Sequence, residues 1–284
     1  MSVVLENMCF IAGCGKCGTT TLAYLMNNHP AIVLSSPKEP NFYSKDSEFI
    51  KGSDYYQSLF RDKDSAKIRL DASVSYTLFD TEQKVADRIL KTCKAPKFIY
   101  IARNPYRRLE SVFSEAHQHT HISKIDMPYD LKSAIKYYLP MVFNSLYWER
   151  TEAIRSYFPA ADILYLTLED LASDQKGTLK RCFDFLKIPG ELFGGEPVQL
   201  NKSTSKTYEP LFLRKTRKFF EIFNFLPQSL LDYLQRKKRR PVNELDFSWD
   251  EEARYFIEIV FREDVRKYLQ AAGKRLSFWG EEFL

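Results

Sequence analysis

The stretch 8–22 constrains the fold of this chain most strongly, because it joins a buried strand to a helix through a glycine-rich turn. Its first part, 8–12, is a short apolar run, which is typical of a buried strand. The turn 13–18 contains three glycines, and a helical pattern of apolar residues begins at Thr19. Such a turn gathers backbone N–H groups at the positive end of a helix, and Lys16 adds a full positive charge. The segment therefore predicts an anion-binding site.

This turn differs from the phosphate loop of nucleoside triphosphatases. That loop has the form G-x-x-x-x-G-K-[ST], whereas here Thr19 follows Gly18 and the lysine lies inside the turn. The hydroxyls of Thr19 and Thr20 add hydrogen-bond donors at the same place. The alternative interpretation is a plain connection between a strand and a helix, in which the glycines serve only the tight geometry.

Strands alternate with helices along the rest of the sequence. The predicted strands are 31–34, 67–72, 97–102 and 162–166, and the predicted helices are 82–92, one that begins at Asn104-Pro105, 143–157, and 169–186 with a break at Gly177. This alternation predicts an α/β fold with a central parallel sheet flanked by helices. A long loop at 191–208 and a helical C-terminal third, over 211–222, 227–238 and 250–271, are also predicted. No internal repeat or linker divides the sequence, so we expect a single domain over 1–284.

Composition places the chain among soluble globular proteins. Apolar residues make up 44% and charged residues 28% of the 284 positions, which excludes disordered and fibrous classes. No apolar run approaches the roughly 18 residues of a membrane span. The five scattered cysteines favour a reducing compartment over a disulfide framework, and the first residues do not resemble a signal peptide. We therefore expect a cytoplasmic protein with no membrane span.

Positive charge is concentrated in 202–240, which holds 11 basic and three acidic residues although the whole chain carries only +5. This excess favours an anionic ligand or surface, and a solvated basic face is the alternative. The run 236–240 is similar to a nucleic-acid patch, but it lacks the glycine and aromatic pattern of an RNA-binding module. We therefore expect no nucleic-acid partner.

A second anion-binding motif follows the predicted strand 97–102. Arg103 comes directly after this strand, and Asn104 and Pro105 are strong signals for the start of a helix. On that helix Arg107 and Ser111 lie on one face, which together with Arg103 suits a phosphate monoester. The alternative is a set of surface charges, with Arg108 among them. Because ligands bind at the carboxyl ends of parallel strands, the two motifs predict a ligand with two separated phosphate groups.

Both motifs resemble those of one enzyme family. The segment 13–22 resembles the 5′-phosphosulfate loop of sulfotransferases, and 103–111 resembles their 3′-phosphate motif. Three more segments are similar to bacterial and heparan-sulfate-type members: Lys38-Glu39-Pro40-Asn41-Phe42-Tyr43, Asp71-Ala72-Ser73-Val74-Ser75-Tyr76, and 261–279 with its Leu276-Ser277-x-Trp279 ending. Asp71 and Val74 stand where glutamate and proline are more usual. The resemblance extends from about residue 8 to residue 279.

The resemblance implies a P-loop-like α/β domain that binds 3′-phosphoadenosine 5′-phosphosulfate (PAPS), transfers its sulfuryl group and releases 3′-phosphoadenosine 5′-phosphate (PAP), without a metal. It assigns the 5′-phosphosulfate to Gly15, Lys16, Cys17, Gly18, Thr19 and Thr20, and the 3′-phosphate to Arg103 and Ser111. The basic loop with Asn201, Lys202 and Ser203 would close over the nucleotide, although it lacks the Arg-Lys-Gly ending of the cytosolic branch.

Sulfuryl transfer needs a cation at the transferred group and a base for the acceptor proton. Lys16 is the expected cation, and Glu39 is the expected base, because glutamate fills this position in the heparan-sulfate-type branch. The alternative for Glu39 is a loop surface charge beside Lys38. Histidine is the rival base, and His117-x-His119-x-His121 follows the second anion motif. This cluster is also compatible with a solvated helix end, with acceptor binding or with a metal site.

The acceptor is expected to be a small molecule, for example a natural product, that presents a hydroxyl or an amine; a glycan or a lipid is the alternative. Candidate acceptor-binding residues are Phe42, Tyr43, Tyr76, His119 and Tyr147, with Tyr137, Tyr138 and Trp148 as further aromatic candidates. The competing interpretation places these aromatic residues in the core. Two non-sulfotransferase functions also remain: a thiol-redox protein using Cys14-x-x-Cys17, and a non-catalytic nucleotide- or nucleic-acid-binding module.

Overall fold

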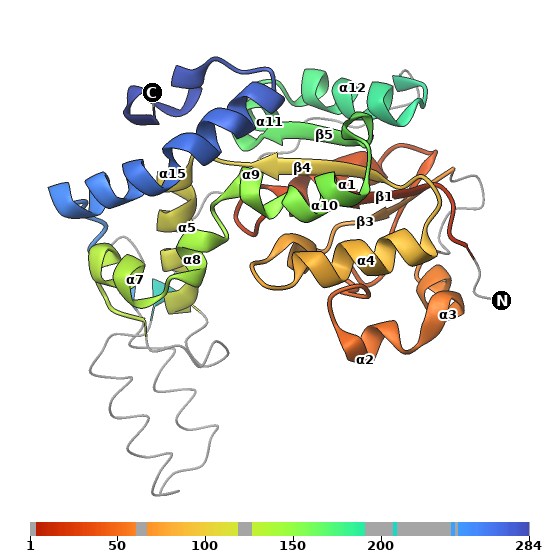
Figure 1. Ribbon diagram of the computed structural model, residues 1–284, viewed down its shortest axis with the longest axis horizontal. Helices are drawn as coiled ribbons and strands as arrows, with labels where there is room; N and C mark the ends of the chain where they lie inside the picture. The colour runs from red at the N-terminus through yellow and green to blue at the C-terminus, as the bar shows by residue number, and fades with distance from the viewer. Residues whose placement is uncertain are drawn as a thin grey trace, which may run out of the picture. The chain divides into compact units, whose positions relative to one another are not determined.

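The structure is a computed structural model that describes residues 4–60, 67–118, 127–190, 207–208, 240–241 and 244–283. It divides into two compact units. The first contains Met1–Pro105, Phe143–Leu200 and Glu258–Leu284, and the second contains Tyr106–Val142 and Asn201–Ile257. Figure 1 shows the elements of both units. In the described part of the chain, no helix has the length and apolar character that crossing a membrane requires.

A five-stranded parallel sheet forms the first unit, and its strand order is β2-β3-β1-β4-β5. All five predicted strands are confirmed: β1 Met8–Ile11, β2 Ile32–Leu34, β3 Ile68–Asp71, β4 Lys97–Ala102 and β5 Ile163–Thr167. The chain leaves β1 toward β2 on one side and leaves β4 toward β5 on the other, so the order reverses between β1 and β4. In open α/β sheets such a reversal creates a crevice at the carboxyl ends of the strands. The two predicted anion-binding motifs follow β1 and β4.

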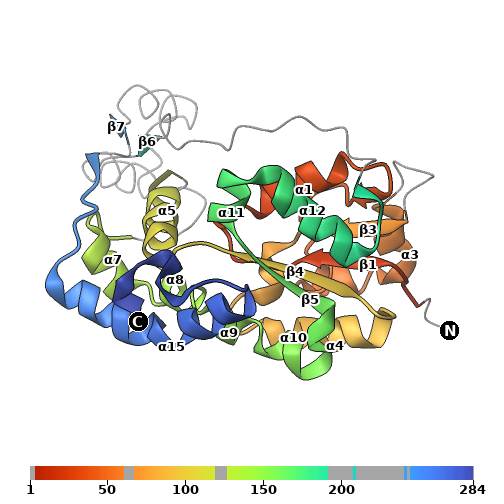
Figure 2. The same ribbon diagram turned by 90° about the horizontal axis from the view of Figure 1, so that it is seen from above.

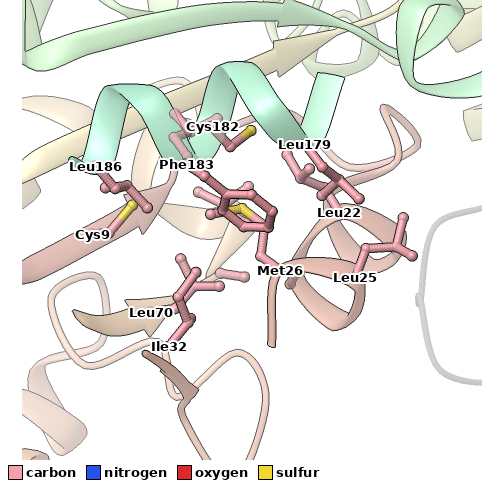
Figure 3. Close-up of a cluster of buried hydrophobic side chains, with 14 of the residues drawn as sticks. Cys9, Leu22, Leu25, Met26, Ile32, Leu70, Leu179, Cys182, Phe183 and Leu186 are labelled. Carbon is pink, nitrogen blue, oxygen red and sulfur yellow. The ribbon is translucent and has the colours of Figure 1, made fainter. Parts of the chain in front are cut away.

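Helices cover both faces of this sheet. One face is covered by α1 (Thr19–Asn27), α11 (Leu168–Ser173) and α12 (Gln175–Leu186), and the other by α4 (Glu82–Thr92) and α10 (Glu152–Tyr157) (Figure 2). On the first face, apolar side chains of α1 and α12 meet those of the strands, as Figure 3 shows for Cys9, Met26 and Phe183. These three side chains are buried, so α1 packs through its last turn against the sheet and α12.

The predicted helix 143–157 is wrong, because the chain forms two short helices there, α9 (Tyr147–Arg150) and α10. The start of α9 depends on a residue far away in the sequence. Asp264 accepts hydrogen bonds from the backbone N–H groups of Trp148 (3.2 Å) and Glu149 (2.8 Å), so its carboxylate caps the start of α9. Burial raises the pKa of Asp264 to about 7, against the effect of these backbone donors. Asp264 lies on α15 (Glu251–Ala271), which confirms the predicted helix 250–271.

The break in the predicted helix 169–186 is confirmed, but it lies at Asp174 instead of Gly177. Asp174 separates α11 from α12 and accepts a hydrogen bond from the N–H of Gly177 at 2.9 Å. It is therefore the N-cap of α12, a role that short acidic side chains favour.

The remaining elements, apart from α5, are short. In the first unit they are α2 (Asp46–Phe49), α3 (Gly52–Ser58), and the 3₁₀ turns η1 (Val74–Thr77), η2 (Ala160–Asp162), η6 (Leu276–Trp279) and η7 (Glu281–Phe283). The second unit contains α7 (Leu131–Tyr137), β6 (Thr207–Tyr208), β7 (Arg240–Pro241) and most of α5 (Pro105–Gln118), which confirms the helix predicted to begin at Asn104-Pro105. One further helix is α8 (Pro140–Phe143). The predicted helices 211–222 and 227–238, and the predicted loop up to residue 206, lie outside the described residues.

Candidate functional site

The turn after β1 runs directly against β4. The N–H of Ala12 donates to the carbonyl of Ile99 at 2.9 Å, which extends the contact between the two strands into the turn. A Cβ atom on Gly13 would lie 2.5 Å from the carbonyl oxygen of Ile101. Only glycine fits at this close approach, so the first glycine of the motif brings the turn to the strand that ends in the second motif.

The N-terminus of α1 faces this turn without a side-chain cap. Gly18 precedes the helix with a φ of 85°, no side chain accepts a hydrogen bond there, and the first turn contains no acidic residue. Lys16 has a φ of 73° and is half-buried, whereas Thr19 is buried and Thr20 is exposed. The helix dipole and the Lys16 charge therefore reinforce each other at one place, as an anion-binding site requires.

We expect Gly18→Ala to lower the free energy of unfolding by about 1–3 kcal/mol, since it adds strain and overpacking. The new Cβ would lie 2.5 Å from Cδ1 of Leu168, at a φ of 85° that suits glycine. Gly15→Ala is the matched control, because its Cβ would meet nothing within 4 Å. Urea unfolding of both variants without ligand tests this, and equal stability of the two would contradict the assigned conformation of Gly18.

The two cysteines of the turn are buried free thiols. The Cys14 thiol donates to the carbonyl of Asn144 and lies 3.3 Å from the Tyr100 hydroxyl. A redox-active thiol needs a partly exposed, thiolate-stabilising environment, and the burial of Cys14 and Cys17 does not provide one. The structure thus corrects the thiol-redox alternative, since these side chains help to pack the turn.

The peptide bond between Arg103 and Asn104 is held at both its carbonyl and its N–H group. The Arg103 carbonyl accepts a hydrogen bond from the Tyr147 hydroxyl at 2.6 Å, and the N–H of Asn104 donates to Glu169 Oε1 at 3.0 Å. Glu169 Oε2 accepts from the indole N–H of Trp279 at 3.0 Å, and the Asn104 side-chain amide donates to the Trp279 carbonyl at 2.7 Å. The backbone that carries Arg103 is therefore rigid. Sequence reasoning missed Glu169, because its partners lie 65 and 110 residues away.

The three arginines of this motif have different environments. Within the described residues, the Arg103 side chain makes no hydrogen bond or ion pair, so its guanidinium is available to a ligand. Arg107 is exposed and pairs with Glu110 at 3.1 Å, whereas Arg108 is buried and donates to the Met141 carbonyl at 3.0 Å. The interpretation of all three as surface charges is therefore wrong for Arg108. Ser111 lies half-buried on α5, in the second unit.

Glu39 lies in the connection between β2 and α2, in a backbone conformation that is unusual for its residue type. Its φ is 60°, and that of Asn41 is 53°. The Glu39 carboxylate forms an ion pair with Lys38 at 2.8 Å and keeps 33% of its side-chain surface exposed. Left-handed conformations at residues other than glycine cost energy and cluster at functional sites. Since β2 ends at the same sheet edge as β1 and β4, the structure brings the Glu39 loop to the edge that carries both anion motifs.

The histidine cluster is only partly described. His117 is buried, its Nδ1 lies 2.9 Å from the Phe113 carbonyl, and its ring packs against Phe113 and Tyr129. The expectation of a solvated helix end is therefore wrong for His117. His119 and His121, like Asn201, Lys202 and Ser203, lie outside the described residues. Among the described residues there is also no cluster of three or more side chains of the types that bind metals.

The candidate acceptor-binding aromatic residues belong to the core. Phe42, Tyr43, Tyr76 and Tyr147 are all at least 98% buried. The Phe42 ring stacks on Tyr56 with centroids 4.3 Å apart, and the Tyr147 hydroxyl is bound to the Arg103 carbonyl. The core interpretation thus describes these four side chains, and their assignment to the acceptor stays a prediction.

Comparison with known proteins identifies the family. The family model described as "Sulfotransferase domain" matches residues 6–225, which is more than half of the chain. The chain belongs to the sulfotransferase family. The first and second motifs both lie inside the matched region.

Several characterised sulfotransferases are similar to this chain. Heparan sulfate glucosamine 3-O-sulfotransferase 5 from Mus musculus is 27% identical over 188 residues, which cover 63% of this chain and 53% of that protein. Bifunctional heparan sulfate N-deacetylase/N-sulfotransferase 2 from Mus musculus is 24% identical, over 96% of this chain and 31% of its own length. This sulfotransferase chain therefore spans about half or less of these relatives.

Solved structures confirm the fold of this sulfotransferase. The crystal structure of a sulfotransferase from Alicyclobacillus acidocaldarius has a TM-score of 0.63 and 18% identity, over 98% of this chain and 99% of that one. Mouse sulfotransferase SULT7A1, complexed with PAP, has a TM-score of 0.51 and 14% identity, over 93% of this chain and 86% of that one. The predicted α/β fold with a P-loop-like parallel sheet is thus confirmed.

Proposed function

We propose that this protein transfers the sulfuryl group of PAPS to a hydroxyl or amine of an acceptor. The observation that carries the proposal is the pairing of two cation-bearing turns at the carboxyl ends of neighbouring strands, β1 with Lys16 and β4 with Arg103, in a chain of this family. PAPS has anionic groups at both ends of its ribose, so one ligand can engage both turns. We further propose that the whole chain, 1–284, acts as one catalytic domain.

The residues of both turns fit this donor. The uncapped N-terminus of α1 and Lys16 suit the 5′-phosphosulfate, with donors from Gly15, Cys17, Gly18, Thr19 and Thr20. The Arg103 guanidinium, without a partner among the described residues, suits the 3′-phosphate, and we assign Ser111 to the same group. We also propose that Asn201, Lys202 and Ser203 contact the nucleotide.

The chemistry needs one new bond, one broken bond and one proton transfer. When bound, PAPS supplies an activated sulfuryl group. The acceptor oxygen or nitrogen bonds to sulfur, the bond from sulfur to the 5′-phosphate oxygen breaks, and PAP leaves with that electron pair. Glu39 takes the acceptor proton, and Lys16 stabilises the negative charge that develops on the departing oxygen. The rigid backbone at Arg103 holds the other end of the nucleotide, which orients the reacting group.

The names of similar proteins suggest an acceptor class. The relatives named above act, by their names, on heparan sulfate, and the name of the first specifies its glucosamine. We therefore propose that a sugar hydroxyl or amine is the first acceptor to test, and the small-molecule acceptor stays a prediction. A transfer assay with ³⁵S-labelled PAPS separates these acceptors when it includes heparosan, phenols, aliphatic alcohols and a water-only reaction. Labelled product from one class supports it, whereas PAP binding without any transfer or hydrolysis would favour the non-catalytic nucleotide-binding alternative.

We expect Arg103→Ala to weaken PAP binding by about 10- to 100-fold, because hydrogen bonds to a charged group contribute roughly 1.5–3 kcal/mol. Affinity for 5′-AMP, which lacks the 3′-phosphate, should stay within about twofold, since it does not depend on such a bond. Arg107→Ala is the control, because Arg107 is exposed and already paired with Glu110. Isothermal titration calorimetry of the wild type and both variants, each with PAP and with 5′-AMP, measures all six affinities. An equal loss for PAP and 5′-AMP would contradict the assignment of Arg103 to the 3′-phosphate.

A further inference from the structure

Asp71, at the end of β3, is a charged side chain that the proposed mechanism does not use. It is completely buried, and four donors converge on its carboxylate. Ser73 donates to Oδ1 through its N–H (3.0 Å) and its hydroxyl (2.7 Å). The hydroxyls of Tyr56 (2.7 Å) and Tyr76 (2.6 Å) donate to Oδ2. A carboxylate accepts all four bonds, so the cluster is fully satisfied.

Two of these donors also accept hydrogen bonds from the loop that carries Glu39. The N–H of Asn41 donates to the Ser73 hydroxyl at 3.1 Å, and the N–H of Tyr43 donates to the Tyr76 hydroxyl at 3.4 Å. Asn41 in turn donates from its side-chain amide to the Glu39 carbonyl at 2.7 Å. A continuous chain of hydrogen bonds thus joins the buried carboxylate to the backbone of the proposed base.

Asp71 sets the direction in which the hydroxyls of Ser73 and Tyr76 donate. Because a carboxylate only accepts, the Ser73 and Tyr76 hydroxyls must point their protons at it and their lone pairs at the loop. Burial, followed by the charge of Asp71, raises the pKa of Tyr76 well above its usual range, so its phenol stays protonated. Burial also raises the pKa of Asp71 itself, and the bonds from the tyrosines and Ser73 act in the opposite direction. The hydroxyls are therefore oriented as acceptors for the N–H groups of the loop.

A second set of bonds holds the same loop. The Ser75 hydroxyl donates to the side-chain carbonyl of Asn41 at 2.6 Å and lies 2.7 Å from the Ser44 hydroxyl. Asn41 is thus held at its backbone N–H and at both ends of its side chain. Glu39 and Asn41 have φ values of 60° and 53°, so the loop keeps conformations that need such support.

We infer that Asp71 is a positioning residue for the proposed base, acting through Ser73 and Asn41 to fix the backbone of Glu39. The inference rests on the proposed function, since it takes Glu39 as the group that accepts the acceptor proton. Asp71 does not touch the reacting atoms. Its contribution is the orientation of two hydroxyls, which holds a strained loop in one geometry at the sheet edge, where small displacements of a catalytic group are costly.

The test compares variants that break the chain of hydrogen bonds at different places. Asp71→Asn replaces one accepting oxygen by an N–H₂ group, which cannot accept the donors that face it. Ser73→Ala is a milder change, which removes the acceptor for Asn41. Tyr56→Phe is the matched control, because its hydroxyl donates to the same carboxylate but no hydrogen bond joins that hydroxyl to the Glu39 loop in the described residues. Each variant is assayed with PAPS and heparosan, and with PAPS and water, while PAP affinity and thermal stability are measured in parallel.

We expect Asp71→Asn and Ser73→Ala to lower kcat by about tenfold or more. Their PAP affinity should stay within about twofold, because the donor-binding turns follow other strands. Tyr56→Phe should lose stability but keep kcat within about twofold. If kcat follows thermal stability across all three variants, Asp71 has only a structural role and the inference fails.

Glu39→Gln in the same assay separates the two proposals. If Glu39→Gln loses most of its kcat while Ser73→Ala keeps the wild-type kcat, the positioning role is overturned and the proposed base is kept. If Glu39→Gln keeps the wild-type kcat, the proposed base is overturned, and the inference fails with it.

Discussion

Lys16→Ala is expected to lower the rate of sulfuryl transfer by about 10²–10³-fold, the effect of removing one preorganised charge or donor from a developing oxyanion. Lys16 lies in the turn between β1 and α1. Its φ of 73° is a left-handed backbone conformation, unlike that of a lysine inside an α-helix. Alanine can adopt the same backbone conformation at no greater cost than lysine, so the variant removes the charge with little change to the turn. Steady-state rates with labelled PAPS measure the loss.

Lys187→Ala is the matched control for this experiment. Lys187 is also a lysine with a left-handed backbone, at a φ of 56°, but it is exposed at the end of α12. Lys187→Ala should keep the wild-type rate of sulfuryl transfer. Lys16→Arg restores positive charge with a different shape, and we expect it to recover part of the lost rate. Wild-type turnover in Lys16→Ala would remove the electrostatic basis of the proposed mechanism, even if PAP still bound.

The fold follows from local patterns wherever the physical cause is local. The strand, glycine turn and helix at 8–27 were predictable, because burial, tight geometry and helical periodicity all act within that segment. The strand ending before Arg103 and the helix start at Pro105 were predictable for the same reason. Parallel pairing then brought both motifs to one sheet edge, and alternation of strands with helices had already indicated this arrangement.

Errors occurred where the cause lies far along the chain. Nothing near 143–157 predicts where α9 begins, because the carboxylate that caps its start belongs to Asp264, 115 residues from Glu149. His117 was expected at a solvated helix end, yet tertiary packing against Tyr129 and Tyr208 buries it. Helical periodicity reports one face of a helix but not which other segments will cover its remaining sides.

The residues of the candidate site also fall into two groups, those that local sequence patterns predict and those that depend on contacts between distant segments. Lys16 and Arg103 are predictable from their places after strands, and the resemblance supplied Glu39. The support behind them was not predictable: Glu169 fixes the N–H of Asn104, and Asp71 reaches the Glu39 loop through Ser73. Such contacts depend on side-chain geometry, which sequence spacing alone does not give.

Glu39→Gln is expected to lower kcat by about 10²–10⁴-fold, the usual contribution of a general base, while PAP affinity stays nearly unchanged. Glutamine has the size of glutamate but cannot take up the acceptor proton at neutral pH. The substitution also removes the ion pair with Lys38, which has an N–O distance of 2.8 Å. Initial rates at saturating PAPS, with PAP titrations on the same preparation, separate the loss of chemistry from a loss of donor binding.

Glu48→Gln controls for the lost ion pair, because Glu48 pairs with Lys51 at 2.7 Å on the neighbouring helix α2 without a proposed role in catalysis. It should keep full activity, since exposed ion pairs contribute at most about 1 kcal/mol to stability. His119→Ala tests the rival base directly. If His119→Ala loses turnover and Glu39→Gln does not, the base is the histidine. The Lys38–Glu39 pair would then be only a surface interaction, and the strained loop at Glu39 would need another explanation, because no proton would pass to the residue that it holds.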